Sequence, residues 1–245
     1  MFDGVSQSHF DRIETPEGLA RCLAASYKTF CSLIRYCNIT GLIDPISALF
    51  PHEYSTKDLS VNIDRFLTSG SRCFGSRTLA EATMLPKRNH ILEIGVAQGS
   101  HAISLIRALQ PLSYTGVDMN FAQLTEDSMA IFKQASSNGV TITLLNQSSS
   151  EALANLSQHN TKFDIIYIDA NHWHSFVADE LSYIPKLLNS GGTVVLNDYT
   201  DWFVGSMEPC GVKVAVDEFL VKNFGKFSLS YYAISDCDIA FSLNC

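Results

Sequence analysis

The sequence predicts an α/β fold built on a doubly wound, mostly parallel sheet that ends in an antiparallel hairpin. Five short β-branched runs between residues 90 and 198 alternate with helical segments, a pattern typical of a parallel sheet covered by helices. Two further strand candidates follow the last helix, and only residues 234–237 separate them. Because a parallel crossover needs about a dozen residues, these two strands must run antiparallel. The sheet is therefore expected to have seven strands.

The positions of apolar residues and helix breakers define the individual elements. The predicted strands are His90–Ile94, Ser113–Asp118, Thr141–Leu145, Phe163–Asp169, Gly192–Asp198, Lys226–Ala233 and Asp238–Leu243. The predicted helices are Ser100–Leu109, Phe121–Ser137, Ser150–Leu156, Ser175–Leu188 and Val212–Asn223. Residues 1–75 contain a helix that begins at Thr15, with Pro16 in its first turn, and a short helix over Asp58–Leu67. We expect residues 1–75 to form a helical cap over the substrate and residues 76–245 to form the main domain.

Composition and charge exclude several classes of protein. The chain has 245 residues, and its 17 Lys and Arg against 25 Asp and Glu give a net charge of -8. No basic run suits a phosphate backbone, so nucleic acid is not an expected partner. The seven cysteines show no Cys-x-x-Cys spacing, and no apolar stretch is long enough to cross a membrane. We therefore expect a soluble, cytoplasmic protein without a nucleic acid or membrane partner, with monomer and homodimer both left open.

A glycine loop lies between the first predicted strand of the main domain and the following helix. In the segment ILEIGVAQGSHA, Gly95 and Gly99 allow a ligand to approach the backbone, and Ser100 is expected to cap the helix. A dinucleotide site would show Gly-x-Gly-x-x-Gly, whereas here Glu93 precedes a Gly-x-x-x-Gly spacing. This difference favours a nucleoside without phosphate, whose amino acid moiety the loop would hold.

The second and third strands end in residues that suit the rest of such a nucleoside. Asp118 closes the second strand, where a carboxylate can accept hydrogen bonds from both ribose hydroxyls, and Met119 follows it. Gln147 and Ser148 follow the third strand and are candidates for contact with the base. Simpler explanations remain: the glycines only form a turn, Asp118 only caps a helix, and Ser148 or Ser149 is a helix N-cap.

Polar side chains also follow the fourth and fifth strands. Asp169 and His172 follow the fourth strand, and Asn197 and Asp198 end the fifth. Carboxylate and amide oxygens are ligands that Mg²⁺ prefers, and they leave positions open for substrate oxygens. His172 has a side chain suited to a general base near neutral pH, and Asp169 is the alternative base. Both carboxylates could instead cap the elements that follow, and His172 could bond a loop carbonyl.

These segments together resemble a known family. EIGVAQGS, GVD, IYIDANH, LLNSGGTVVLNDY and GVKVAVDEF are similar to the macrocin-type O-methyltransferases, a branch of the class I S-adenosylmethionine-dependent methyltransferases with sugar- and catechol-type relatives. The resemblance implies a Rossmann-like seven-stranded sheet, S-adenosylmethionine as cofactor, and Mg²⁺ held by Asp169 and Asp198. Family members have Asp-Asp where this chain has Asn197 and Asp198, so metal binding here is expected to be weaker or absent.

The cofactor set predicted in this way is Glu93, Gly95, Gly99, Ser100, Asp118, Met119, Gln147, Ser148 and Asp169, and the metal set is Asp169, Asn197 and Asp198. The resemblance implies methyl transfer to a hydroxyl of a small molecule such as a sugar or phenolic secondary metabolite. A metal-independent N- or C-methyltransferase and a non-catalytic S-adenosylmethionine-binding protein are the alternatives. Trp173, Tyr199, Trp202 and Phe203 could form an aromatic wall for the acceptor, and Thr200–Cys210 could form a lid.

Overall fold

A computed structural model describes residues 72–74, 77–87, 89–199, 210–233 and 236–245. The helices predicted from Thr15 and over Asp58–Leu67 lie outside the described residues, and so do Trp202, Phe203 and nearly all of the predicted lid. The described residues therefore belong almost entirely to the main domain.

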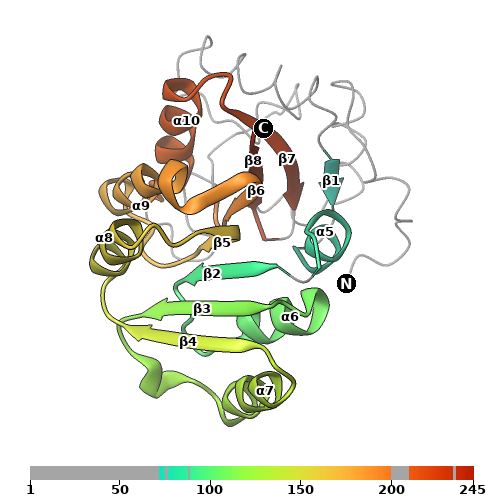
Figure 1. The fold of residues 1–245 in the computed structure, drawn as a ribbon. Coiled ribbons are helices and arrows are strands. Elements are labelled where there is room, and N and C mark those ends of the chain that lie inside the picture. The colour runs from blue at the N-terminus through green and yellow to red at the C-terminus, as the bar shows by residue number, and fades with distance from the viewer. Residues whose placement is uncertain (1–71, 75–76, 88, 200–209, 234–235) are drawn as a thin grey trace, which may run out of the picture.

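A mixed sheet forms the centre of this domain, in the strand order β1-β7-β8-β6-β5-β2-β3-β4 (Figure 1). The parallel strands of the predicted core are β2 (His90–Ile94), β3 (Ser113–Asp118), β4 (Thr141–Asn146), β5 (Phe163–Ile168) and β6 (Leu188–Leu196). Strand β8 (Asp238–Leu243) runs antiparallel between β6 and β7 (Phe227–Ala233). All seven predicted strands are confirmed, and so is the terminal antiparallel hairpin.

An eighth strand extends the sheet beyond the prediction. Residues Arg72–Phe74 form β1, which pairs in parallel with β7 at the edge of the sheet. Three residues are too few to give a periodic pattern in the sequence, so nothing indicated a strand there. These residues fall within the segment that the sequence grouped with the cap, and the boundary at residue 75 stays a prediction.

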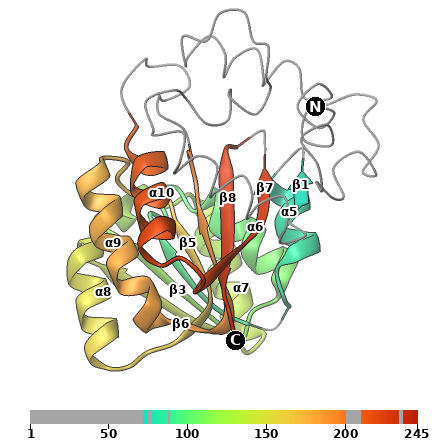
Figure 2. The ribbon, with the colours of Figure 1, turned by 90° about the horizontal axis from the view of Figure 1, so that it is seen from above.

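Helices cover both faces of the sheet (Figures 1 and 2). Helices α8 (Ser149–Gln158), α9 (His174–Leu187) and α10 (Val212–Lys222) pack on one face, and α5 (Arg77–Met84), α6 (Ser100–Leu109) and α7 (Glu126–Ser137) pack on the other. In β2, Leu92 and Ile94 point into the core beneath α8, α9 and α10, and Ile91 points into the core beneath α5, α6 and α7. This alternation places Glu93, between Leu92 and Ile94, on the face covered by α5 and α6. None of the described helices is long and apolar enough to cross a membrane.

Two helical predictions need correction. The helix predicted over Phe121–Ser137 is broken into a 3₁₀ turn (Phe121–Gln123) and α7, because the Thr125 side chain accepts a hydrogen bond from the Ser128 amide and caps α7. Helix α5 was not predicted, and the sequence was expected to be irregular up to about Arg77. The other helices begin and end within two residues of their predicted bounds, which is the usual uncertainty of helix ends.

Candidate functional site

A cavity of about 380 Å³ opens where the glycine loop (residues 95–99) meets the ends of β3 and β5. This volume lies within the range of small-molecule sites. The described lining residues that the sequence had predicted for the cofactor are Gly95, Asp118, Met119, Gln147, Ser148 and Asp169. The structure thus brings six of the nine predicted residues around one cavity at the carboxyl edge of the sheet, where ligands bind in folds of this type.

Close backbone packing explains the two glycines. Gly95 has a φ of +90°, and a Cβ there would lie 2.0 Å from the carbonyl oxygen of Asp169. Gly99 has a φ of +82°, and a Cβ there would lie 2.7 Å from the Ser128 hydroxyl oxygen. Other residues adopt such φ values only with strain. Gly95 therefore joins the glycine loop to the segment after β5, and Gly99 joins it to α7 without lining the cavity.

Asp118 fastens the glycine loop to the end of β3. One carboxylate oxygen accepts a hydrogen bond from the Ala97 amide at 2.8 Å, and the other accepts one from the Asn120 amide at 2.8 Å. Each oxygen can accept more than one hydrogen bond, and the half-buried side chain lines the cavity. Asp118 is therefore oriented by the backbone while it still offers acceptors to a ligand. Met119 beside it is 76% exposed at the cavity wall.

Gln147 and Ser148 line the cavity from the start of α8. The simpler explanation of Ser148 is confirmed, because its hydroxyl caps α8 and forms a capping box with Glu151. The Gln147 amide donates to the Asp118 carbonyl. A capping role and a place in the cavity wall are therefore compatible.

Glu93 and Ser100 lie elsewhere than the prediction assumed. Glu93 is fully buried on the opposite face of the sheet, where its carboxylate meets His101 Nδ1 at 3.0 Å and the Tyr114 hydroxyl at 2.5 Å. Ser100 is the exposed first residue of α6, and its predicted role as N-cap is wrong, because Gly99 occupies that position without a side-chain cap. Neither residue is among the described residues that line the cavity.

Three side chains beside the cavity form what we call the acceptor-side group: Asp169, His172 and Asp198. His172 Nε2 lies 3.3 Å from a carboxylate oxygen of Asp169 and 3.3 Å from one of Asp198. One ligand atom from each residue lies within 4.8 Å of the others, a spacing that suits a shared divalent ion. Since Asp169 also lines the cavity, a methyl acceptor bound at this group would lie next to a ligand in the cavity.

Burial and opposite charges set the protonation of this group. Burial lowers the pKa of His172, but the hydrogen bond to Asp169 and the charge of Asp198 outweigh it, so its pKa lies above the usual 6.5. Burial raises the pKa of Asp198, and the positive charge of His172 partly offsets this effect. A proton and a metal ion would therefore compete for His172 Nε2 between the two carboxylates.

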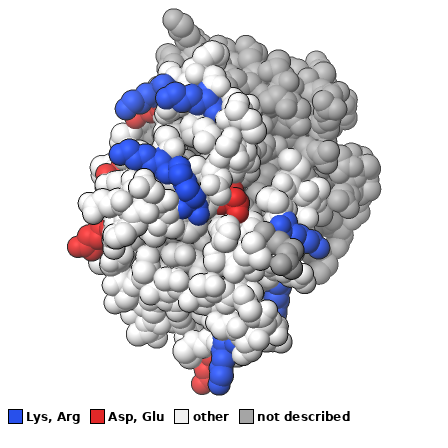
Figure 3. All heavy atoms as spheres, in the orientation of Figure 1, with Lys and Arg blue, Asp and Glu red and all other residues white. Residues whose placement is uncertain are grey.

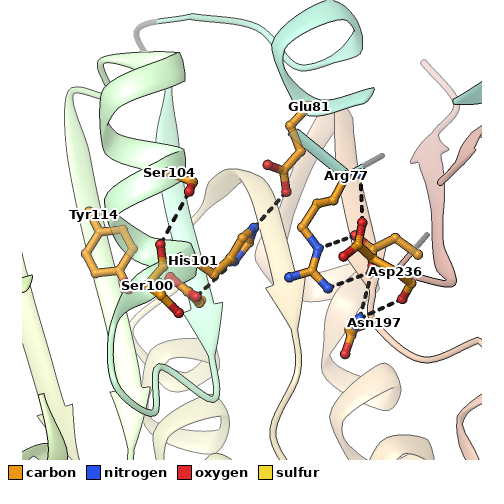
Figure 4. Close-up of polar contacts among 10 residues, drawn as sticks. Arg77, Glu81, Ser100, His101, Ser104, Tyr114, Asn197 and Asp236 are labelled. Carbon is orange, nitrogen blue, oxygen red and sulfur yellow. Dashed lines mark hydrogen bonds and ion pairs between the residues drawn. The ribbon is translucent and has the colours of Figure 1, made fainter. Parts of the chain in front are cut away.

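Asn197, the third predicted metal ligand, faces a different set of partners. Its amide nitrogen donates to the Asp236 carbonyl and to the Asp238 carboxylate, both at 2.9 Å. Asp238 also receives two hydrogen bonds from the Arg77 guanidinium, at 2.6 and 3.1 Å, so Asn197 belongs to a buried ionic junction (Figure 4). Burial opposes the charged guanidinium, but the attraction of Asp238 outweighs it and raises the pKa of Arg77. His172 supplies the third side chain of the acceptor-side group.

Asp198 is held between two anchored neighbours. Its φ of +53° lies in the left-handed region, which costs energy for any residue with a Cβ. Asn197 is fixed by its bonds within the ionic junction, and the Tyr199 amide donates to the Cys237 carbonyl at 2.8 Å. The Tyr199 hydroxyl donates to Asp217 at 2.5 Å. These contacts on both sides hold Asp198 with its carboxylate toward His172.

Helix α10 supports the acceptor-side group at two places, beside His172 and beside Asp198. The Gly211 amide donates to the His172 carbonyl at 2.7 Å, and a Cβ at Gly211 would lie 2.1 Å from the His174 amide nitrogen. Asp217 accepts hydrogen bonds from Tyr199 and, at 2.6 Å, from the buried ammonium of Lys213. The first turns of α10 therefore fix both His172 and the neighbourhood of Asp198.

This packing corrects one part of the predicted aromatic wall. Tyr199 is 2% exposed and packs in the core, where it supports Asp198 instead of facing an acceptor. In the part of the chain that the structure describes, Trp173 is 71% exposed, and it remains a candidate for contact with an acceptor. His174 lies outside this wall and pairs with exposed Glu218 at 2.8 Å.

Glu180 is a residue that sequence analysis missed. It is fully buried on α9, and a hydrogen-bonding contact with Ser149 stabilises its charged form only in part. Burial raises its pKa to about 7, with Asp179 adding to the shift and Ser149 and His172 opposing it. A signal did exist, because Glu180 shares the apolar stripe of α9 with Val177, Leu181 and Ile184. A carboxylic acid therefore lies behind the acceptor-side group in mostly apolar surroundings.

Comparison with family models finds a likeness in the central part of the chain. Residues 92–199 match the model of a family described as a methyltransferase domain. Comparison with curated proteins finds no match.

Solved structures of similar fold include a putative S-adenosylmethionine-dependent methyltransferase from Streptococcus mutans, with a TM-score of 0.51 and 12% identity over 69% of this chain and 49% of that chain. A putative rRNA methylase from Clostridium thermocellum has a TM-score of 0.51 and 12% identity over 69% and 93% of the two chains. An O-methyltransferase from Bacillus cereus in complex with SAH has a TM-score of 0.49 and 15% identity over 89% and 91%. At these identities the first two structures support the fold alone.

Proposed function

We propose that this chain, an enzyme that carries a methyltransferase domain over residues 92–199, transfers the methyl group of S-adenosylmethionine to a hydroxyl of a small molecule. The observation that carries the proposal is the position of Asp169. It lines the cavity and is also part of the acceptor-side group. A hydroxyl at that group would therefore face the donor methyl at short range, and alignment of the two reactants is the main contribution an enzyme makes to a direct displacement.

The described residues fit S-adenosylmethionine. Asp118 offers oriented acceptors for the ribose hydroxyls, and Ser148 and Met119 line the part of the cavity next to it. The left-handed Gly95 leaves the backbone of the glycine loop open to the amino acid moiety. When bound, the cofactor supplies a sulfonium methyl that a deprotonated oxygen can attack.

His172 is the proposed general base, and Asp169 and Asp198 orient it. Neutral His172 can accept the proton of an acceptor hydroxyl. Because its pKa is raised above 6.5, the neutral form accumulates only above that pH. The rate of methyl transfer should therefore increase as the pH rises through the pKa of His172.

The acceptor-side group also fits a divalent metal. With a metal bound, Asp169, His172 and Asp198 would hold the ion, and the ion, acting as a Lewis acid that lowers the pKa of a bound hydroxyl, would take the place of His172 as the activating group. Two carboxylates and one imidazole suit Mn²⁺ at least as well as Mg²⁺, because imidazole is a softer ligand than oxygen. Residues 1–75 are proposed to supply the remaining wall of the acceptor site.

The runner-up is a metal-independent N- or C-methyltransferase. Its premise is that Asp169 and Asp198, each with a carboxylate oxygen 3.3 Å from His172 Nε2, serve as hydrogen-bond acceptors instead of metal ligands. The methyltransferase match of residues 92–199 favours either enzyme over a non-catalytic binding protein.

The described Lys and Arg side chains on the face shown in Figure 3 lie apart from one another and form no continuous basic stripe.

The test is a methylation screen. The purified protein, radiolabelled S-adenosylmethionine and a panel of hydroxylated sugars and phenols, each with its matched amine, are incubated with EDTA or with added Mg²⁺ or Mn²⁺. We expect methylation of hydroxyl compounds and of none of the amines, with a higher rate when metal is present. Transfer to amines that EDTA does not affect would support the runner-up. Absence of S-adenosylhomocysteine binding in isothermal titration would refute both.

A further inference from the structure

Three buried side chains and the half-buried His101 form a continuous polar chain behind the glycine loop, on the face of the sheet away from the cavity. His101 on α6 bonds Glu81 on α5 through Nε2 at 2.7 Å and Glu93 on β2 through Nδ1 at 3.0 Å. Glu93 in turn accepts from the hydroxyl of Tyr114 on β3 at 2.5 Å. Figure 4 shows His101 between the carboxylates, with Tyr114 on the neighbouring strand. We call these four residues the buried chain.

The geometry fixes the charge of His101. Both ring nitrogens face carboxylate oxygens, and ionised carboxylates only accept hydrogen bonds. With both carboxylates ionised, both nitrogens carry a proton and the ring is an imidazolium. Burial lowers the pKa of His101, but Glu93 and Glu81 outweigh it and raise the pKa to about 10. The ring also lies against Tyr167, with 3.9 Å between the ring centroids. His101 is thus a fixed cation from acid to mildly alkaline pH.

The buried chain brackets the glycine loop. Glu93 lies two residues before Gly95, and His101 lies two residues after Gly99. Their ion pair therefore joins the two ends of the loop, and Glu81 and Tyr114 tie this pair to α5 and β3. None of the four belongs to the described residues that line the cavity. Contact with a ligand is thus not what these charges provide.

We infer that Glu93 and His101 are positioning residues, which hold the glycine loop in the shape that receives the amino acid end of S-adenosylmethionine. The inference rests on the proposed cofactor. It gives Glu93 an indirect part in cofactor binding in place of the direct contact expected from the sequence. The ribose and base ends of the cavity are held differently, by Asp118 and by the capped start of α8. Damage to the buried chain should therefore affect one end of the ligand.

The experiment compares two ligands that differ only in that end. S-adenosylhomocysteine carries the amino acid moiety, and 5′-methylthioadenosine lacks it. Isothermal titration with both ligands is carried out on the full chain and on the His101→Gln and Glu93→Gln variants. The control is Leu105→Ala, which truncates a fully buried side chain of the same helix and destabilises the fold without removing a polar group of the buried chain.

We expect His101→Gln and Glu93→Gln each to bind S-adenosylhomocysteine about 10-fold more weakly, which is the scale of one lost charge-assisted hydrogen bond. Both variants should bind methylthioadenosine nearly as well as the unmodified protein. Leu105→Ala should preserve both affinities at a temperature where it is folded. Equal losses for both ligands, or the same selective loss in Leu105→Ala, would mean that the buried chain only stabilises the fold, and unchanged affinities would overturn the inference directly.

Tyr114→Phe provides a milder variant should the others not fold. It removes one hydrogen bond of the chain and keeps the ring, so we expect a smaller loss, about 3-fold, again confined to S-adenosylhomocysteine. An unmodified protein that binds neither ligand would refute the proposed function itself. Binding by the unmodified protein with no selectivity in any variant would refute the inference alone.

Discussion

The cofactor side and the acceptor side of the site meet at Asp169 but are held by different kinds of contact. On the cofactor side, backbone conformation dominates: Gly95 and Gly99 have positive φ, and Asp118 accepts from backbone amides. On the acceptor side, three ionisable side chains are aimed by other buried polar residues from α10 and from the ends of the sheet. The residues that line the cofactor side are held mainly through the backbone, with the buried chain behind the glycine loop, whereas the acceptor side consists of contacts between distant side chains.

Gly95→Ala should produce the largest effect, because it damages the contact that joins the two sides. The new Cβ would lie 2.0 Å from the Asp169 carbonyl, so the glycine loop or the segment after β5 must move. We expect S-adenosylhomocysteine affinity in isothermal titration to fall by about 100-fold or more, a few kcal/mol as for other strained backbone positions. Gly139→Ala is the matched control, because Gly139 also has a positive φ but a Cβ there meets nothing within 4 Å. Equal losses in both variants would contradict this explanation.

Asp217→Ala should damage the acceptor side alone. It leaves the buried Lys213 ammonium without its carboxylate and removes the partner of the Tyr199 hydroxyl. Breaking a buried pair in this way costs about 3–5 kcal/mol of unfolding free energy, measurable by urea denaturation. At low temperature the folded fraction should bind S-adenosylhomocysteine with unchanged affinity. The control is Glu218→Ala, a change at an exposed neighbour, which should alter neither the unfolding free energy nor the S-adenosylhomocysteine affinity. A loss of S-adenosylhomocysteine affinity in Asp217→Ala would show that the cofactor side and the acceptor side are not independent.

Glu180→Gln tests whether the acceptor side makes stability depend on pH. Burial raises the pKa of Glu180 to about 7 from 4.5, so the folded state binds this proton more tightly than the unfolded state. Its contribution to stability is therefore complete below pH 4.5 and is lost as the pH rises through 7, on the order of 3 kcal/mol. Denaturant titrations at pH 4.5, 6 and 8 should show the unmodified protein losing stability relative to Glu180→Gln across this range. Parallel curves for the two proteins would exclude an acidic group with a raised pKa.

Asp198→Ala should have the smallest effect and sharpen the metal assignment. Loss of one carboxylate ligand should weaken Mn²⁺ binding, followed by electron paramagnetic resonance, by about 10-fold or more. S-adenosylhomocysteine affinity should stay within about 2-fold, because Asp198 is not among the described residues lining the cavity. Asp127→Ala, which removes an exposed carboxylate in the first turn of α7, is the control. Mn²⁺ binding that is equal in both variants would place the ion elsewhere.

The same contrast explains what the sequence could predict. The seven strands depend on local apolar patterns and the hairpin on a short connection, and these were predicted within a few residues of their ends. The approach of Gly95 to Asp169 and the place of Asp118 in the cavity follow from the order of strands in a parallel sheet. The cofactor side was therefore largely predictable.

The remaining features depend on contacts between residues far apart in the chain. The direction of Asn197 depends on Asp238, some 40 residues later, and the support of Asp198 depends on the pairing of Tyr199 with Asp217. Glu93 was placed next to the ligand because it precedes the glycine loop, whereas strand alternation turns it to the opposite face. That alternation could have been read from Leu92 and Ile94, which flank it.

Asp169 contributes to the site through both its main chain and its side chain. Its peptide carbonyl lies against Gly95, and its carboxylate faces His172. Because a substitution at position 169 changes the carboxylate but leaves the carbonyl in place, the chemistry of the proposed acceptor side can vary while the main-chain contact with the glycine loop is preserved.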